Sequence, residues 1–292
     1  MSTQVTTAFV QQFSSNVQLL SQQIGSRLRA SVSEESVTGE KAFFDQIGEA
    51  AAIKRTSRHG DTPLVDTPHS RRMVTMDTYE WADLIDDADK VRMLIDPTST
   101  YARAAAAAIG RAMDDAIIEA ALGTAKTGKS GTGSTSLPSS QQIANGSADL
   151  SITKLIEAKS ILDQSDVDPS IPRYIAVSPR QIEALLNTTA VVSSDYNTVK
   201  ALVQGEIDTY LGFKFIVSNR LEKAGNIRSC FAWAMDGMKL AVGKDVMARI
   251  EDRADKSFST QVYYCATFGA TRMEEDKVVQ IDCDESATLS FS

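Results

Sequence analysis

Residues 96–123 read DPTSTYARAAAAAIGRAMDDAIIEAALG, a stretch dominated by alanine. The triplet Asp96-Pro97-Thr98 predicts a helix start, because proline is favoured in the first turn, where its missing N–H would have no partner. Gly123 predicts the end of the helix. At 1.5 Å per residue, a helix over 98–122 would be about 37 Å long. Its apolar face is mostly alanine, which lets a sheet or another backbone approach closely, so we expect this helix to support the whole fold.

Two stretches of opposite charge precede this helix. From Ala50 to Met76 the chain is polar and is interrupted by prolines; residues before proline favour extended backbone, which predicts a long protruding hairpin. This stretch is basic: it contains two acids, Asp61 and Asp66, and the five cations Lys54, Arg55, Arg58, Arg71 and Arg72. The next stretch is acidic: it contains two cations, Lys90 and Arg92, and the seven acids Asp77, Glu80, Asp83, Asp86, Asp87, Asp89 and Asp96. We expect the two stretches to pair, within one subunit or between neighbouring subunits.

The N-terminal region carries a narrow apolar stripe at steps of three and four residues, which predicts an amphipathic helix over 6–28. The stripe consists of Val10, Phe13, Val17, Leu20 and Ile24. Ser31 to Glu40 is rich in Ser, Glu and Gly and is expected to be a linker. The stripe must therefore pack against either its own domain or a neighbouring subunit.

The region after the long helix changes character twice. Residues 124–147 are rich in Gly, Ser and Thr and predict a mobile loop. A compact α/β subdomain follows, with helices expected over 152–162, 179–186 and 196–203 and strands over 173–177 and 214–217. The final third, 230–292, predicts strands and turns, with Val279, Ile281 and Cys283 alternating against polar neighbours.

The composition is that of an ordinary soluble protein, because 292 residues with 42% hydrophobic content suffice for a large core. A formal net charge of −8 argues against a protein that coats nucleic acid, since phosphate binding needs cation clusters. Three widely spaced cysteines predict neither a disulfide framework nor a zinc site. No window is apolar enough for a membrane span, and no signal peptide is recognisable, so we expect an unprocessed cytosolic protein.

One motif matches a nucleotide-binding pattern. The stretch Gly123-Thr-Ala-Lys-Thr-Gly128-Lys129-Ser130 fits Gly-x4-Gly-Lys-Ser, but a phosphate loop must follow a strand and open a helix. Here a helix precedes the motif and a Gly/Ser tract follows it, which favours a helix-exit loop. The two histidines, His59 and His69, lack the spacing of metal ligands. We therefore expect no catalytic residue, no cofactor and no metal, and a protein that is not an enzyme.

Several stretches resemble a known family. They are Asp66-Thr-Pro-His69-Ser-Arg-Arg72, Tyr79-Glu-Trp81-Ala-Asp-Leu-Ile-Asp86-Asp87, Met93-Leu-Ile-Asp-Pro97-Thr, Arg111-Ala-Met-Asp114-Asp115, Gly205-Glu-Ile207 and Leu211-Gly212-Phe213-Lys-Phe-Ile-Val217. With the order of the predicted elements, they resemble the major capsid protein of tailed bacteriophages in its podovirus-type branch, over about residues 40–285. These motifs are structural and carry no catalytic signature.

The resemblance implies the α+β capsid fold of tailed phages and herpesviruses. Its expected parts are an N-terminal arm (1–45), an extended β-hairpin loop with its flanks (46–96), a peripheral domain with the long spine helix (97–149), an α/β axial domain (150–225) and the β region and C-terminus of the peripheral domain (226–292). It also implies a self-assembling icosahedral head that encloses double-stranded DNA without reading its sequence. Hexamers and pentamers, a portal, and scaffolding or decoration proteins are the implied partners. The implied location is the virion, assembled in the host bacterial cytoplasm.

The expected subunit contacts combine the apolar stripe, the basic hairpin and the acidic stretch. They are Val10, Phe13, Val17, Leu20, Ile24, Arg55, Arg58, Arg71, Arg72, Asp83, Asp86, Asp87 and Asp89. Two alternatives remain at this point. One is a nucleotide-binding enzyme that uses the 123–130 loop, and the other is a non-viral, encapsulin-like nanocompartment shell.

Overall fold

The longest helix lies where the alanine-rich stretch predicts it. The computed structural model describes residues 22–58, 60–62, 64–85, 98–186 and 209–287, and in it α2 runs over Thr98–Leu122. The inward face of α2 is buried at every turn, at Ala105, Ile109, Met113 and Ile117. The small side chains near the start of this face let strands approach closely. The expectation of a long helix over 98–122 is therefore confirmed.

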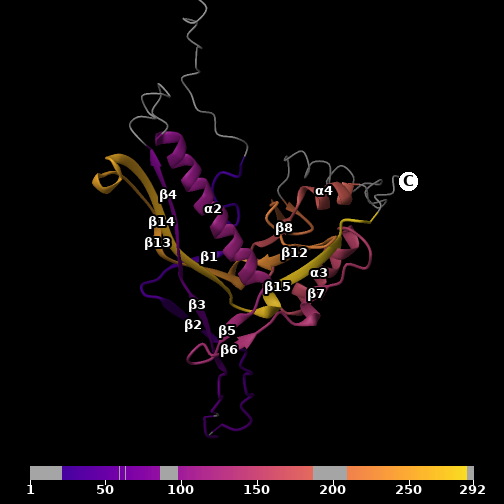
Figure 1. The fold of residues 1–292 in the computed structure, drawn as a ribbon. Helices are drawn as coiled ribbons and strands as arrows, with labels where there is room; N and C mark the ends of the chain where they lie inside the picture. The colour runs from indigo at the N-terminus through magenta and orange to yellow at the C-terminus, as the bar shows by residue number, and fades with distance from the viewer. Residues whose placement is uncertain (1–21, 59, 63, 86–97, 187–208, 288–292) are drawn as a thin grey trace, which may run out of the picture.

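A four-stranded sheet lies against α2, which runs along β4 and β14 (Figure 1). In spatial order its strands are β1 (Ser33–Ser36), β13 (Met238–Arg253), β14 (Ser259–Arg272) and β4 (Asp77–Ile85). Because β1 pairs in parallel with β13, the expectation of a linker is wrong for these four residues. The strand is held in place just before it starts, where Trp233 Nε1 donates to Ser31 O at 2.9 Å.

A seven-stranded sheet forms the other half of the molecule. Its strands, in spatial order, are β7 (Gln142–Ile143), β15 (Val278–Asp284), β12 (Ile227–Ala234), β8 (Arg173–Val177), β10 (Phe213–Val217) and β9 (Thr209–Tyr210), with β11 (Lys223–Ala224) beside β12. Antiparallel β12 pairs with β8, so strands on both sides of the expected boundary at 225/226 belong to one sheet.

Two shorter helices accompany this sheet. The first, α3 (Ile152–Gln164), starts at Ser151, whose side chain accepts from Lys154 N at 3.4 Å. The second, α4 (Pro179–Leu186), has the expected bounds. The strand expected over 173–177 is likewise confirmed, whereas the helix expected over 196–203 lies outside the described residues.

The main core joins α2, α3 and the seven-stranded sheet. Trp233 and Phe231 are fully buried and stack with ring centroids 4.7 Å apart. Val279, Ile281 and Cys283 all face inward, which confirms the predicted alternation. The three cysteines are free and buried.

A third, smaller sheet contains the predicted hairpin. Its strands are β2 (Lys41–Ile47), β3 (His69–Thr75), β5 (Ala125–Thr127) and β6 (Gly133–Thr135). The expectation of an unstructured loop over 124–147 is wrong where β5, β6 and β7 form. Gly128 and Gly131 have φ of +90° and +70°, which let the chain reverse between β5 and β6.

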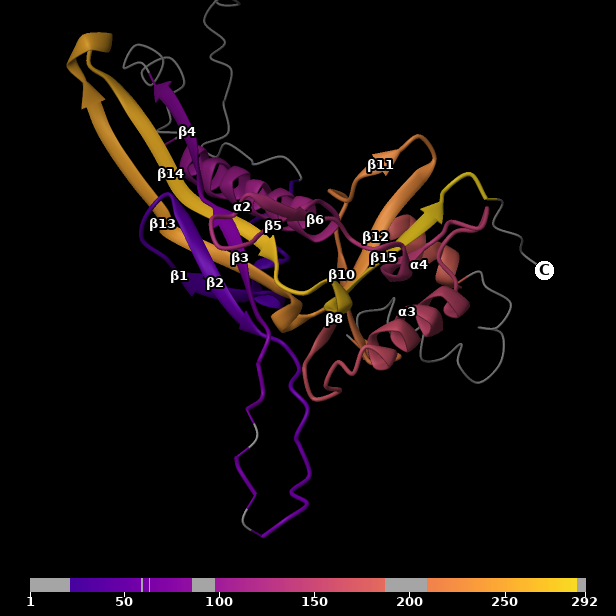
Figure 2. The same cartoon turned by 90° about the horizontal axis from the view of Figure 1, so that it is seen from below.

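The ladder between β2 and β3 ends at the pair Ile47 and His69. Gly48 N donates to Pro68 O at 2.8 Å. Beyond this bond, the described residues 49–58, 60–62 and 64–67 belong to an open, protruding loop (Figure 2). The protruding hairpin is thus confirmed, although its strands begin earlier than expected. The acidic stretch begins as a strand, β4.

The small sheet and the four-stranded sheet cross where β14 passes the bend between β3 and β4. At Gly269 an added Cβ would overlap the carbonyl oxygen of Thr75, so only glycine permits this approach. Short 3-10 helices complete the described chain: η2 (Arg29–Ser31), η3 (Ser139–Gln141), η5 (Met235–Gly237), η6 (Ala254–Lys256) and η7 (Glu275–Lys277). No helix of the described chain is long and apolar enough to cross a membrane.

Candidate subunit-contact surfaces

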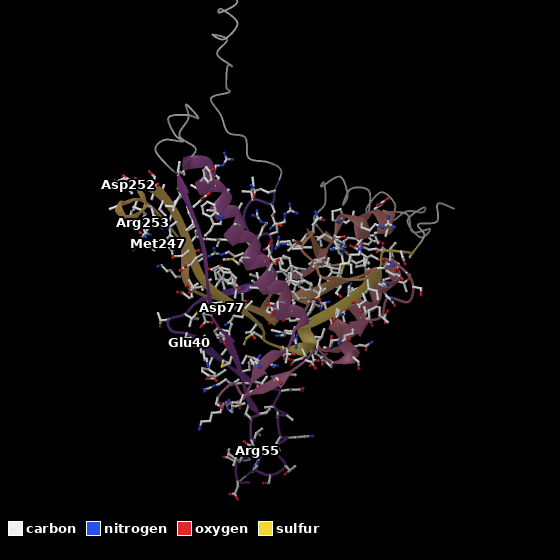
Figure 3. All side chains as sticks on the ribbon, viewed as in Figure 1. Glu40, Arg55, Asp77, Met247, Asp252 and Arg253 are labelled. Atoms are coloured by element: carbon white, nitrogen blue, oxygen red, sulfur yellow. The ribbon has the colours of Figure 1, made fainter. Side chains whose placement is uncertain are left out.

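The extended loop, residues 48–68, presents apolar side chains to solvent. Leu64 is 94% exposed and Ile53 58% exposed. Arg55 lies at the far end of the loop (Figure 3), where its Nε donates to Ser57 O at 2.7 Å. A loop that holds apolar and cationic side chains this far from its own core offers them to another molecule.

The two arginines at the base of this loop are held within their own chain. Arg72 is only 8% exposed; its Nε donates to Met273 O at 2.8 Å and its Nη2 to Glu275 Oε2 at 2.5 Å. Arg72 is thus held by its own chain, which gives no support to the expected contact with a neighbouring subunit; that contact stays a prediction. Arg71 forms an ion pair with Asp45, and hydrogen bonding from Arg71 lowers the pKa of the Asp45 carboxyl. The loop cations that remain are Lys54, Arg55 and Arg58.

A second buried arginine connects this base to α2. Arg272 is fully buried; its Nη1 donates to Ala121 O at 2.8 Å and to Gly123 O at 2.9 Å, which satisfies carbonyl groups at the end of the helix. Its Nε lies 3.6 Å from Glu275 Oε1. Burial lowers the pKa of Arg272. Glu275 therefore joins Arg72 and Arg272, and through them the extended loop to α2.

Of the four acidic residues expected to contact a neighbouring subunit, the structure describes one. Asp83 is half-buried on β4, and its Oδ1 accepts from Leu84 N at 2.8 Å. Asp86, Asp87 and Asp89 lie outside the described residues. Over residues 41–85, where the structure is described almost throughout, the basic and acidic stretches form no ion pair with each other, because Arg71 and Arg72 use Asp45 and Glu275.

Residues 22–32 form a segment, here named the N-terminal anchor, that packs against α2. The predicted helix is wrong for 22–28, which are not helical, and the stripe residues Val10, Phe13, Val17 and Leu20 lie outside the described residues. Ile24 is 74% exposed. Helical hydrogen bonds are replaced here by bonds to Asp114 of α2, which accepts from the backbone N–H groups of Arg27 and Leu28 at 3.1 Å.

Asp114, Gly110 and Arg272 are functional candidates that sequence reasoning missed as such. Gly110 is a weak helix former within an alanine-rich helix, which signals a close approach of another segment. Arg272 ends a strand that is otherwise rich in apolar and small residues. Their partners, however, lie far away along the chain and follow only from the fold.

Comparison with known proteins settles the family. The family model described as "Phage capsid protein" matches residues 5–285. This chain belongs to the phage capsid protein family. It is a major capsid protein, a structural component of the virion whose copies form the shell of the head.

Solved phage capsids share the fold of this capsid protein. The capsid of cyanophage P-SCSP1u has a TM-score of 0.75 at 17% identity, with 97% of this chain and 95% of that chain covered. The capsid of Ralstonia phage GP4 has a TM-score of 0.73 at 11% identity, with 95% of each chain covered. The capsid of cyanophage Pam1 has a TM-score of 0.71 at 13% identity, with 97% of this chain and 98% of that chain covered. No curated protein sequence matches the chain.

Residues 123–130 of the capsid protein lack the arrangement of a phosphate loop. The motif follows α2 and forms β5 and its turn into β6, so the next element of the described chain after Lys129 and Ser130 is a strand, and not a helix. The nucleotide-binding alternative is therefore not favoured, and neither is the nanocompartment shell. In the described part of the chain, no group of three or more His, Cys, Asp or Glu side chains is placed to hold a metal ion.

Proposed function

We propose that this capsid protein assembles as hexamers and pentamers of an icosahedral head that encloses double-stranded DNA. The observation that carries this proposal is the extended loop, whose exposed Leu64 and Ile53 have no core of their own to enter. An isolated two-stranded ribbon is marginally stable in water, and a neighbouring copy would cover it.

The expected division of the chain becomes part of the proposal. The N-terminal arm (1–45) and the extended loop with its flanks (46–96) would reach neighbouring subunits. The peripheral domain (97–149 and 226–292) would carry them, and the axial domain (150–225) would face the vertices. The charged contacts we retain are Arg55, Arg58, Asp83, Asp86, Asp87 and Asp89. Arg71 and Arg72 are left out of the proposal because they pair with Asp45 and Glu275 of their own chain.

The DNA would be contained without being read. The net charge of −8 supports this, because a shell that bound the phosphate backbone tightly would need an excess of cations. Portal, scaffolding and decoration proteins would be further partners, and assembly would take place in the host bacterial cytoplasm. In this proposal the protein catalyses no reaction.

A charge-reversal experiment tests the role of the loop. We expect Lys54→Glu/Arg58→Glu to fold normally and to yield far fewer shells by negative-stain imaging, with added salt weakening wild-type assembly in the same direction. The matched control is Lys159→Glu/Lys214→Glu, which changes the net charge equally on exposed residues of α3 and β10. Normal shells from the loop variant would contradict the proposed charge contacts.

A further inference from the structure

We propose that Asp114 is a positioning residue that fixes where the N-terminal arm leaves the subunit, and so aims residues 1–21 at a neighbouring copy. The aim of the arm rests on the proposed function, whereas the anchoring of residues 22–28 by Asp114 can be tested without it. The inference starts from the donors that this single buried carboxylate accepts from.

The carboxylate of Asp114 is completely enclosed by the N-terminal anchor. Its side chain is 0% exposed. Ser26 Oγ donates to Oδ1 at 2.5 Å and Gln23 Nε2 donates to Oδ2 at 2.5 Å. The backbone N–H groups of Arg27 and Leu28 add bonds of 3.1 Å. An ionised carboxylate only accepts hydrogen bonds and has about four acceptor sites, so these four donors match its capacity.

The helix face around Asp114 is shaped for the same segment. Gly110 lies one turn before Asp114, and a Cβ on Gly110 would overlap the backbone of Gly25 and Ser26. Gly25 itself has φ of +75°, which turns the chain at this contact. A carboxylate and a missing side chain, four residues apart on one helix face, thus form a socket for residues 23–28.

Two arginines hold the anchor from its sides. Arg111 Nη1 donates to Gln22 Oε1 at 2.8 Å and to Gln23 O at 3.2 Å. Arg27 Nη1 donates to Val217 O at 2.5 Å, at the end of β10. The anchor therefore bridges α2 and the seven-stranded sheet, so the point at which the preceding residues enter the subunit is fixed relative to both halves of the fold.

If Asp114 stabilised the whole fold, its replacement would unfold the subunit; if Asp114 only positions the anchor, its replacement would release the anchor alone. The last part of the anchor, residues 28–32, has its own support, because Leu28 and Val32 are buried and Trp233 Nε1 donates to Ser31 O. Replacing Asp114 by asparagine keeps the shape of the side chain but removes one acceptor oxygen, and its NH2 group then faces donors. The loss should free residues 22–28 and leave the rest of the subunit folded.

Limited trypsin digestion measures this release directly. We expect Asp114→Asn to be cleaved after Arg27 about tenfold faster or more than wild type, because cleavage follows the population of the open anchor. Cleavage in the extended loop, after Lys54, Arg55 and Arg58, serves as the internal standard and should not change. The matched control is Asp115→Asn, which removes only the partly exposed ion pair with Arg220 and should match wild type after Arg27.

If Asp114→Asn unfolds and trypsin cleaves it at many sites, a second variant is needed to test the socket. Gly110→Ala removes no hydrogen-bonding group, and its added Cβ would overlap only the backbone of Gly25 and Ser26, so it should give the same selective cleavage after Arg27. Cleavage at wild-type rates in both variants would overturn the socket. The deletion of residues 1–21 separates the two proposals: normal shells from it would refute the arm's proposed contact and leave the digestion result standing.

Discussion

Two ribbons project from this capsid protein, and they are built in opposite ways. In the β13–β14 hairpin the ladder continues to the pair Arg253 and Ser259 at its end, and β4 pairs along β14. In the extended loop the ladder stops at Ile47 and His69. Figure 3 places Arg253 and Arg55 at the ends of the two projections, well apart on the molecule.

The difference between the ribbons lies in which molecule supports them. The inward face of β14 carries Val262 and Phe268, both buried in the region covered by α2, so the hairpin takes its shape from its own subunit. The extended loop has Leu64 and Ile53 in solvent, and its base is held by the β2–β3 ladder, by the Gly48–Pro68 hydrogen bond and by Arg72. One ribbon is thus paired along its length within its own chain, whereas the other is paired only at its base. Ile250 and Phe258 near the end of the hairpin are exposed as well, so the two ribbons differ in their pairing rather than in exposed apolar residues.

The largest expected loss of stability comes from truncating a buried aromatic side chain of the β13–β14 hairpin. Phe268 is 1% exposed and stacks on Tyr79 with ring centroids 4.5 Å apart. Phe268→Ala should lower the free energy of unfolding by about 3–5 kcal/mol in urea denaturation. Its counterpart in the extended loop, Leu64→Ala, should leave monomer unfolding unchanged and reduce only shell yield. A stability loss for Leu64→Ala would remove the distinction between the ribbons.

The base of the extended loop should give the next largest effect. Arg72→Met leaves Glu275 buried with Arg272 alone, and breaking a buried ion pair by removing one partner costs about 3–5 kcal/mol. We expect the low end of that range, because Arg272 remains. Arg71→Met, the adjacent residue with an exposed ion pair, is the control and should unfold like wild type. Equal denaturation midpoints for the two variants would contradict a base fixed by Arg72.

The smallest effect concerns the end of the β13–β14 hairpin. Arg253 donates to both carboxylate oxygens of Asp255 at 2.8 Å, which lowers the pKa of Asp255 to about 2. A depressed pKa in the folded state means that this pair stabilises the tip above the ordinary value of about 3.9 and stops doing so as the pH falls toward 2. Carboxyl NMR titration should show a midpoint near 2, returning to about 3.9 in Arg253→Gln. An unchanged midpoint in the variant would show that the tip is not closed by this pair.

Sequence reasoning succeeded where the signal is local. The helix 98–122, the strand 173–177 and the helix 179–186 all follow from periodicity and end signals within the segment itself. It failed at Ser33–Ser36, because Ser-Glu-Glu-Ser has little strand propensity and becomes a strand only through pairing with Lys239–Val242.

The candidate site was less accessible to sequence reasoning than the fold. The exposed loop cations Arg55 and Arg58 follow from charge patterning and remain predictions as subunit contacts. Arg72 looked equivalent to them, but it pairs with Glu275, which lies 203 residues away along the chain. Asp114 looked like an ordinary helix acid, and only the folded chain brings Gln23 and Ser26 to it.

The parallel pair β1–β13 has a consequence for the order of events during synthesis. Residues 33–36 leave the ribosome early but pair only with residues 239–242, and Arg27 reaches Val217 only after that strand exists. Contacts of such high sequence separation form late in folding. The bonds of the N-terminal anchor to Asp114 can form once α2 has been made, whereas its bonds to Val217 and Trp233 and the pairing of β1 must wait for residues 217–242. The anchor is therefore held on both sides only after most of the chain has been synthesised.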